Sequence, residues 1–242
     1  MSVRDEYSGV TLTPRVLRVL DPSDWSEILA EASSVLLEGG LVVYPTDTSY
    51  GLGCDPQKKK ALERLLSLKD RDRKLGVPLL FSDLTQCETY HDFGPLEEII
   101  VRLFWPGALT LVVSPRETVP DYISGERASI AVRVPDHSIP RRLAEEIGGP
   151  IVGTSANRSG GPSPFEISVA IEQLGDEVDV YIDGGPSAAS DDSTMIGVEK
   201  ADTGGEHLDI RLYREGQLSM ERISADLAKD PDALMFWTTR IV

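Results

Sequence analysis

The sequence predicts an α/β fold in which helices flank a twisted, open sheet of mixed parallel and antiparallel strands. Apolar segments of strand length alternate with segments of helical period along most of the 242 residues. The last strand-like segments follow one another without a helix between them, so some neighbouring strands must be antiparallel. A hydrophobic fraction of 40% is enough to bury a core without disulfides or metals.

Each predicted helix has its own signal. Apolar residues recur at helical spacing from Trp25 to Leu36, and Asp21 followed by Pro22 is typical of a helix start. Asp55 and Pro56 repeat that pattern before a second helix. The same spacing predicts further helices at 96–103, 138–147 and 167–174.

The predicted strands are short and apolar. They lie at 41–44, 77–81, 109–113, 130–134, 150–152, 178–185, 193–198 and 208–214. Three connecting segments are predicted to be loops because they are rich in turn formers or charges, and they lie at 45–56, 69–76 and 154–164.

No repeat or linker divides the chain. We predict a loose N-terminal arm or an edge strand at 1–15, a main domain at 16–216, and a C-terminal appendage at 217–242 with one weakly amphipathic helix.

The charge and composition exclude several classes of function. Asp and Glu outnumber Lys and Arg by 40 to 24, giving a net charge of -16 that disfavours non-specific binding to nucleic acids and anionic membranes. Two cysteines cannot form a disulfide framework, and MSVRDEYSGV lacks the apolar core of a signal peptide, so we expect a cytoplasmic protein. No apolar run is long enough to span a bilayer.

Common catalytic motifs are absent from the sequence. It contains no GxxxxGK[ST] phosphate loop, and Asn157 stands where a GxSxG elbow around Ser155 needs glycine. The three histidines share no metal-ligand spacing, so we expect no metal site built by the protein.

Two polar loops that follow apolar strands are candidate binding loops. One contains Thr48 and the other contains Ser155 and Asn157. Ligands of open α/β sheets bind beyond the carboxyl ends of strands, although ordinary turn chemistry explains either loop equally well.

Two sets of basic residues stand out against the acidic chain. Lys69 and Arg71 begin the segment KDRDRK, which could neutralise phosphate charge; a solvated helix end is the alternative. Arg133 lies within an apolar strand, on the face predicted to be less buried, where it would bind a carboxylate or form an internal salt bridge.

Taken together, these segments resemble the YrdC/YciO family, whose best-known members are threonylcarbamoyl-AMP synthases. The matching stretches are GGLVVYPTDTSYGLGCD, LKDRD…PLLF, WPGALTLVV, IAVRVPDH, PIVGTSANRSGGPSP and YIDGG…STMIGV…LYREG. They occur in family order and extend from about residue 25 to residue 216.

The resemblance implies a deep, locally positive central groove and a reaction. L-Threonine, bicarbonate or CO2, and ATP would give threonylcarbamoyl-AMP and pyrophosphate, with Mg2+ accompanying ATP. The product would pass to the transferase complex that modifies tRNA adenosine, so this chain would not need to bind tRNA itself.

The resemblance also assigns roles to residues. By analogy, the residues for ATP are Lys69, Arg71, Asn157 and Arg214, of which Lys69 and Arg71 would be catalytic. The residues for threonine are Thr48, Arg133, Ser155 and Ser193.

Three positions depart from the usual family pattern. Asp72 replaces a proline, Ser82 replaces a histidine expected to contact threonine, and Glu215 interrupts the usual RPG turn. The first two are more typical of the YciO-like branch, so a YciO-like protein with weak or different ATP-dependent carbamoyl-adenylate chemistry is one alternative. A binding module for double-stranded RNA is the other, although the net charge of -16 argues against it.

Overall fold

The computed structural model describes residues 14–19, 25–201 and 207–242. Asp21, Pro22 and most of the predicted N-terminal arm therefore lie outside the described residues. The helices are α1 (Trp25–Leu37), α2 (Lys59–Leu68), α3 (Leu84–Glu88), α4 (Pro95–Phe104), α5 (Asp121–Ser124), α6 (Ser138–Glu146), α7 (Ile167–Leu174), α8 (Met220–Lys229) and α9 (Ala233–Phe236), with 3-10 turns η2 (Arg73–Leu75) and η3 (Gly175–Glu177).

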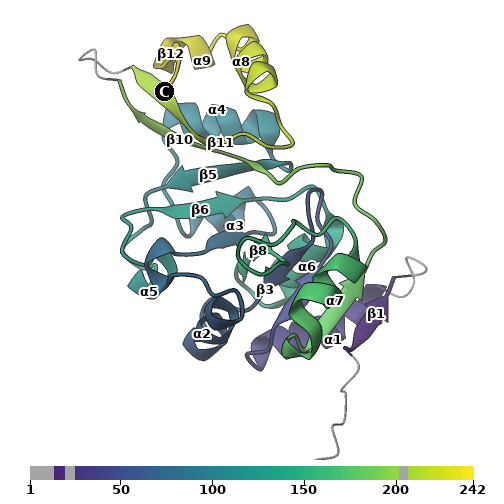
Figure 1. Cartoon of the computed structure of the whole chain (residues 1–242). Coiled ribbons are helices and arrows are strands. Elements are labelled where there is room, and N and C mark those ends of the chain that lie inside the picture. The colour runs from purple at the N-terminus through teal and green to yellow at the C-terminus, as the bar shows by residue number, and fades with distance from the viewer. Residues whose placement is uncertain (1–13, 20–24, 202–206) are drawn as a thin grey trace, which may run out of the picture.

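The strands form two mixed sheets rather than one (Figure 1). The first has five strands in the order β1 (Val16–Arg18), β9 (Val180–Asp183), β2 (Val42–Tyr44), β3 (Gly51–Gly53) and β8 (Thr154–Ser155). The second has seven in the order β12 (Trp237–Ile241), β11 (Leu208–Arg214), β10 (Thr194–Lys200), β5 (Leu109–Val113), β6 (Ile130–Arg133), β4 (Pro78–Leu80) and β7 (Ile151–Val152). Both sheets contain parallel and antiparallel pairs, as the sequence predicts.

A single glycine connects β7 of the larger sheet to β8 of the smaller one. Ile151 and Val152 belong to the larger sheet, whereas Thr154 and Ser155 belong to the smaller one. A Cβ atom at Gly153 would lie only 2.3 Å from Cγ of Leu80, so the crossing allows no side chain there. The loop predicted from residue 154 was therefore wrong for its first two residues.

Both faces of β2, within the smaller sheet, are covered. Val42 and Tyr44 face a core layer with α1 and α6, whereas Leu41 and Val43 face the main core with α2 and α7. This explains why the segment 41–44 is apolar throughout, because neither face of β2 is exposed to water.

The segment Gly51–Gly53 was predicted to be irregular, but it forms β3 opposite β2. The two glycines do not form a turn here. They leave room for neighbouring atoms that pack against the backbone of β3. A Cβ at Gly51 would lie 2.5 Å from the Tyr44 ring, and one at Gly53 would lie 2.4 Å from the Val152 carbonyl oxygen.

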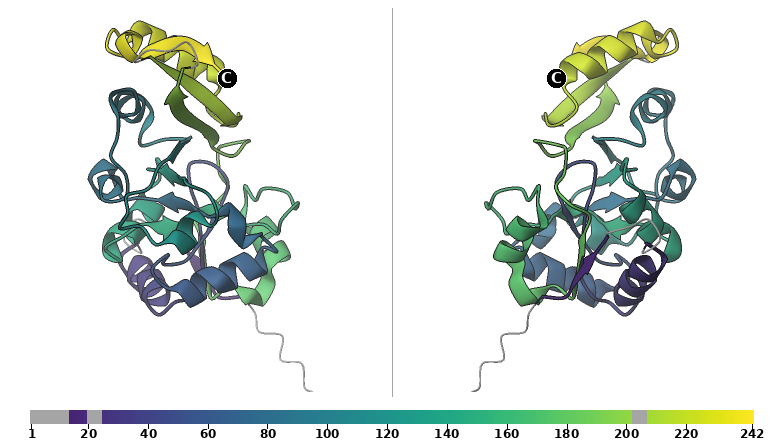
Figure 2. Two further views of the ribbon diagram at one scale, coloured as in Figure 1. Left: turned by 90° about the vertical axis from the view of Figure 1, so that its left-hand side faces the viewer. Right: turned by 90° about the vertical axis from the view of Figure 1, so that its right-hand side faces the viewer.

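The C-terminal elements stack at one end of the molecule, where α9 contacts both α4 and α8 (Figures 1 and 2). The predicted appendage contains α8 and α9, and it also contributes β12, which pairs in parallel with β11. The division of the chain at residue 216 stays a prediction. No helix in the described ranges has the length and apolar character to cross a membrane.

Trp237 anchors this end of the chain. It is 4% exposed within the main core, and its indole Nε1 donates to the Arg240 carbonyl oxygen at 3.0 Å. We predict that Trp237→Ala lowers the free energy of unfolding by about 3 kcal/mol, because a large buried ring is lost. Urea denaturation would measure it, with Met235→Ala, at a side chain 68% exposed, as the control. Equal stability of the two variants would contradict this role.

Candidate functional site

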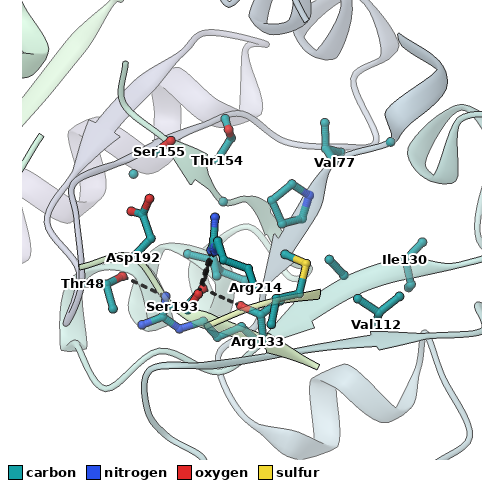
Figure 3. Close-up of a pocket in the computed structure, with 18 of the residues that line it drawn as sticks. Thr48, Val77, Val112, Ile130, Arg133, Thr154, Ser155, Asp192, Ser193 and Arg214 are labelled. Atoms are coloured by element: carbon teal, nitrogen blue, oxygen red, sulfur yellow. Dashed lines mark hydrogen bonds between the residues drawn. The ribbon is translucent and has the colours of Figure 1, made fainter. Parts of the chain in front are cut away.

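A cavity of about 230 Å³ lies where the two sheets meet. Its walls come from the β2–β3 connection and β8 of the smaller sheet, and from β4, β5, β6, β10 and β11 of the larger sheet. Figure 3 shows Thr48 and Asp192 on one side of the cavity, and Val77 and Ile130 on the other. The predicted deep central groove stays a prediction.

The predicted site residues fall into two groups. Six line the cavity, although they come from distant parts of the chain: Thr48, Arg71, Arg133, Ser155, Ser193 and Arg214. Lys69 and Asn157 are buried behind this wall, beneath Ser155.

The end of α2 explains how neighbouring residues reach different places. Asp70 adopts a left-handed conformation, with φ of 49°, just after the helix. Its N–H donates to the Ser67 carbonyl at 3.1 Å and that of Arg71 donates to the Leu66 carbonyl at 3.0 Å, which is a Schellman motif. The helix therefore ends sharply, so that Lys69 is 4% exposed while Arg71 reaches the cavity wall.

Lys69 binds the loop that carries Ser155 and Asn157. Its Nζ donates to the carbonyl oxygens of both residues, at 2.7 Å for Asn157, and to Asn157 Oδ1 at 3.2 Å. Ser155 Oγ also donates to Asn157 Oδ1 at 2.6 Å. The alternative of a solvated helix end is therefore wrong for Lys69.

Arg133 is 5% exposed, so its predicted position on the less buried face is wrong. Its Nη1 donates to Thr48 Oγ1 at 3.0 Å (Figure 3). Its Nη2 forms an ion pair with Asp47 at 2.6 Å, and Nε donates to the Gly107 carbonyl at 2.8 Å. The internal salt bridge is thus present, yet the guanidinium also lines the cavity. Two of its five N–H groups remain for a ligand.

The first candidate loop, which contains Thr48, forms an ordinary turn and also lines the cavity. Thr46 Oγ1 accepts from the Thr48 N–H at 3.0 Å and donates to the Ser49 carbonyl at 2.7 Å, which is an ordinary turn. This turn directs Thr48 Oγ1 toward Arg133 at the cavity wall.

Ser193 lies between β5 and β11. Its Oγ is 2.8 Å from Thr110 Oγ1, and Arg214 Nη2 donates to it at 3.2 Å and to its carbonyl at 2.8 Å (Figure 3). The side chain of Arg214 is thereby held against the cavity.

Sequence reasoning missed Asp192 and Arg127. Asp192 accepts from Ser49 Oγ at 2.5 Å and from Ser163 Oγ at 2.8 Å, which joins two loops at the cavity. It directly precedes Ser193, so its position in the chain was the available signal. Arg127 lines the cavity from the segment after α5, where no pattern distinguished it from other surface arginines.

The comparisons place the chain in a family. A family model named Sua5_yciO_yrdC, with the description "Telomere recombination", matches residues 34–212. The chain belongs to this family. A relative from Chromohalobacter salexigens, named threonylcarbamoyl-AMP synthase, is 35% identical over 176 residues, which cover 72% of this chain and 95% of that protein.

Two solved structures are similar in fold. Sua5 of P. abyssi complexed with L-threonine has a TM-score of 0.79 and 30% identity, and it covers 96% of this chain. This chain spans 63% of the length of that Sua5. E. coli YciO has a TM-score of 0.71 and 26% identity, and the match covers 84% of this chain and 94% of that one.

We predict that Lys69 titrates well below an ordinary lysine. Burial and the Arg71 guanidinium lower its pKa from 10.5 to about 8, although Asp192 opposes the shift. The unfolded chain therefore binds more protons than the folded chain between pH 8 and 10.5, so the stabilising contribution rises with pH across that window and is lost as pH falls through 8.

NMR titration of the lysine side chains would measure this pKa. Arg71→Gln should raise it, whereas Lys74→Gln, at an exposed lysine paired with Glu126, should leave it unchanged. A Lys69 pKa near 10.5 in the unaltered protein would contradict the prediction.

Proposed function

We propose that this chain is an L-threonylcarbamoyladenylate synthase, a nucleotidyltransferase that uses L-threonine, bicarbonate or CO2, and ATP. The observation that carries the proposal is the charge of the cavity. Among the described residues that line it, four are arginines (Arg71, Arg127, Arg133 and Arg214), and the only carboxylate is Asp192. In a chain of net charge -16, this concentration of positive charge favours an anionic ligand.

The side of the cavity that contains Thr48 supports binding of an amino acid. The carboxylate of threonine would accept from the two remaining N–H groups of Arg133, whose orientation Asp47 and Thr48 already fix. The hydroxyls of Thr48, Ser155 and Ser193 would complete the threonine site, because they suit its polar groups.

Arg71 and Arg214 would bind the phosphates of ATP, and Asn157 would support its binding from behind Ser155. We infer that Lys69 is a positioning residue, because its ammonium group contacts oxygens of Ser155 and Asn157. Its direct contact with phosphate stays a prediction.

Mg2+ would arrive with ATP and neutralise part of the triphosphate charge. The described residues contain no group of three or more His, Cys, Asp or Glu able to hold a metal ion. Asp192 offers one carboxylate at the cavity, which fits an ion held mainly by phosphates and water.

The reaction requires positioning and charge neutralisation. The threonine amine adds to CO2 and loses a proton, and an oxygen of the resulting carbamate attacks the α-phosphorus of ATP. The bond from that phosphorus to the bridging oxygen breaks, and pyrophosphate leaves. The arginines would stabilise the negative charge that moves onto the leaving group. The adenylate would then pass to a transferase complex that modifies tRNA.

Incubation with ATP, threonine and labelled bicarbonate tests the proposal. We expect a labelled adenylate and an equal amount of pyrophosphate, and neither should form when threonine is omitted. ATP binding that does not respond to threonine, without a labelled product, would favour the YciO-like alternative.

We predict that Arg71→Gln lowers the rate of pyrophosphate release by about 10²–10³, the effect of removing one preorganised donor. Arg142→Gln is the matched control, because Arg142 is exposed and does not line the cavity. Rates unchanged in both variants would contradict a catalytic role for Arg71.

We predict that Arg133→Lys raises the KM for threonine more than the KM for ATP. A lysine keeps the charge but lacks the planar fork that could hold Asp47, Thr48 and a carboxylate together. Steady-state kinetics with each substrate varied in turn would measure the difference, and an equal rise in both values would contradict a specific threonine contact.

A further inference from the structure

Arg71 and Arg127 line the same cavity from two segments that are joined by backbone hydrogen bonds. The Glu126 N–H donates to the Lys74 carbonyl at 3.1 Å, and the Val77 N–H donates to the Ile123 carbonyl at 3.1 Å. Gly76, with φ of 64°, makes the approach possible, because a Cβ there would lie 2.6 Å from the Ser124 carbonyl oxygen. The positions of the two arginines are therefore coupled by the backbone.

Neither guanidinium has a carboxylate partner among the described residues. Arg71 Nε is buried and lacks any hydrogen-bond partner within the described ranges. Arg127 is exposed, and it forms no ion pair with a residue that the structure describes. The adjacent carboxylate, Glu126, is instead paired with Lys74 at 2.9 Å. In a chain with an excess of acids, two cations therefore line the cavity without an ion pair to any carboxylate among the described residues.

The positive charge of Arg127 disfavours the charged form of Arg71. Burial, followed by the charge of Arg127, lowers the pKa of Arg71 from its ordinary value. An anion between the guanidinium groups would remove this repulsion and satisfy the unpartnered Nε.

We propose that Arg127 and Arg71 form a guanidinium pair that binds the β- and γ-phosphates of ATP, which leave together as pyrophosphate. The identity of this polyphosphate rests on the proposed function. Val77 and Ile130, which follow the two arginines in their segments, lie across the cavity from Thr48 and Asp192 (Figure 3). The α-phosphate must lie near threonine, so cations on the far side would meet the leaving group.

Calorimetric titration of the full chain with pyrophosphate alone tests this pair. We expect Arg127→Gln to weaken binding about tenfold or more, as for loss of a charge-assisted hydrogen bond, and Arg127→Lys to weaken it less. Arg142→Gln should bind as the unaltered chain does. In the Arg71→Gln background, removal of Arg127 should have a smaller effect, because the two groups share one anion.

A thermal melt separates binding from folding. If Arg127 serves a ligand, Arg127→Gln should melt no lower than the unaltered chain without pyrophosphate, and should show a smaller rise in Tm when pyrophosphate is added. A lower Tm without ligand, together with unchanged affinity, would show a structural role and overturn the proposal.

The remaining outcomes distinguish the inference from the function on which it rests. Pyrophosphate binding that depends on Arg127, without formation of a labelled adenylate, would support the pair and count against the synthase. Adenylate formation with unchanged pyrophosphate affinity in Arg127→Gln would overturn the pair alone. Failure of the unaltered chain to bind pyrophosphate would also overturn it.

Discussion

The candidate site depends on one buried ammonium group. Lys69 Nζ binds oxygens of Ser155 and Asn157, which fixes the loop after β8 against the end of α2. Side chains of the same loop also bind the backbone at the end of α2. Ser159 Oγ donates to the Lys69 carbonyl at 2.5 Å, and Arg158 Nη1 donates to the Leu68 carbonyl at 3.0 Å. A charge this deeply buried is stable only because several oxygens replace its water. The same contact sets the wall of the cavity.

The arginines at the cavity differ in whether a carboxylate among the described residues balances their charge. Arg133 balances its charge against Asp47 and keeps two N–H groups for a ligand, so it is fixed before any ligand arrives. Arg71 and Arg127 have no such balance among the described residues, and their mutual repulsion is a cost that an anion removes. Preorganised and uncompensated cations therefore lie in one cavity, which is the arrangement expected where negative charge must be held and then released.

Most of the regular structure could be predicted from the sequence, because apolar periodicity is a local signal. The helix start predicted at Asp55 and Pro56 was wrong, because α2 begins at Lys59 and Asp55 instead accepts a hydrogen bond from the Gln57 N–H. The strand Leu109–Val113 and the helix Ile167–Leu174 have the predicted bounds. The errors arose where tertiary contacts decide: Gly51–Gly53 reads as a turn, but its glycines admit the Tyr44 ring. For the site, loop position identified Thr48 and Ser155, and the family resemblance supplied Arg214. The burial of Arg133 and the bridging by Asp192 follow from partners far away in the chain, which no local pattern reveals.

The crossing at Gly153 makes the cavity a joint property of both sheets. Residues on its two sides belong to different hydrogen-bonded ladders, and a single residue without a side chain carries the backbone from one ladder to the other. The two ladders are also joined beside the crossing, because the Val152 N–H donates to the Cys54 carbonyl at 3.0 Å and the Tyr44 hydroxyl donates to the Val152 carbonyl at 2.6 Å. The distance between opposite walls of the cavity is therefore set partly by buried residues at this crossing, and not by the lining residues alone.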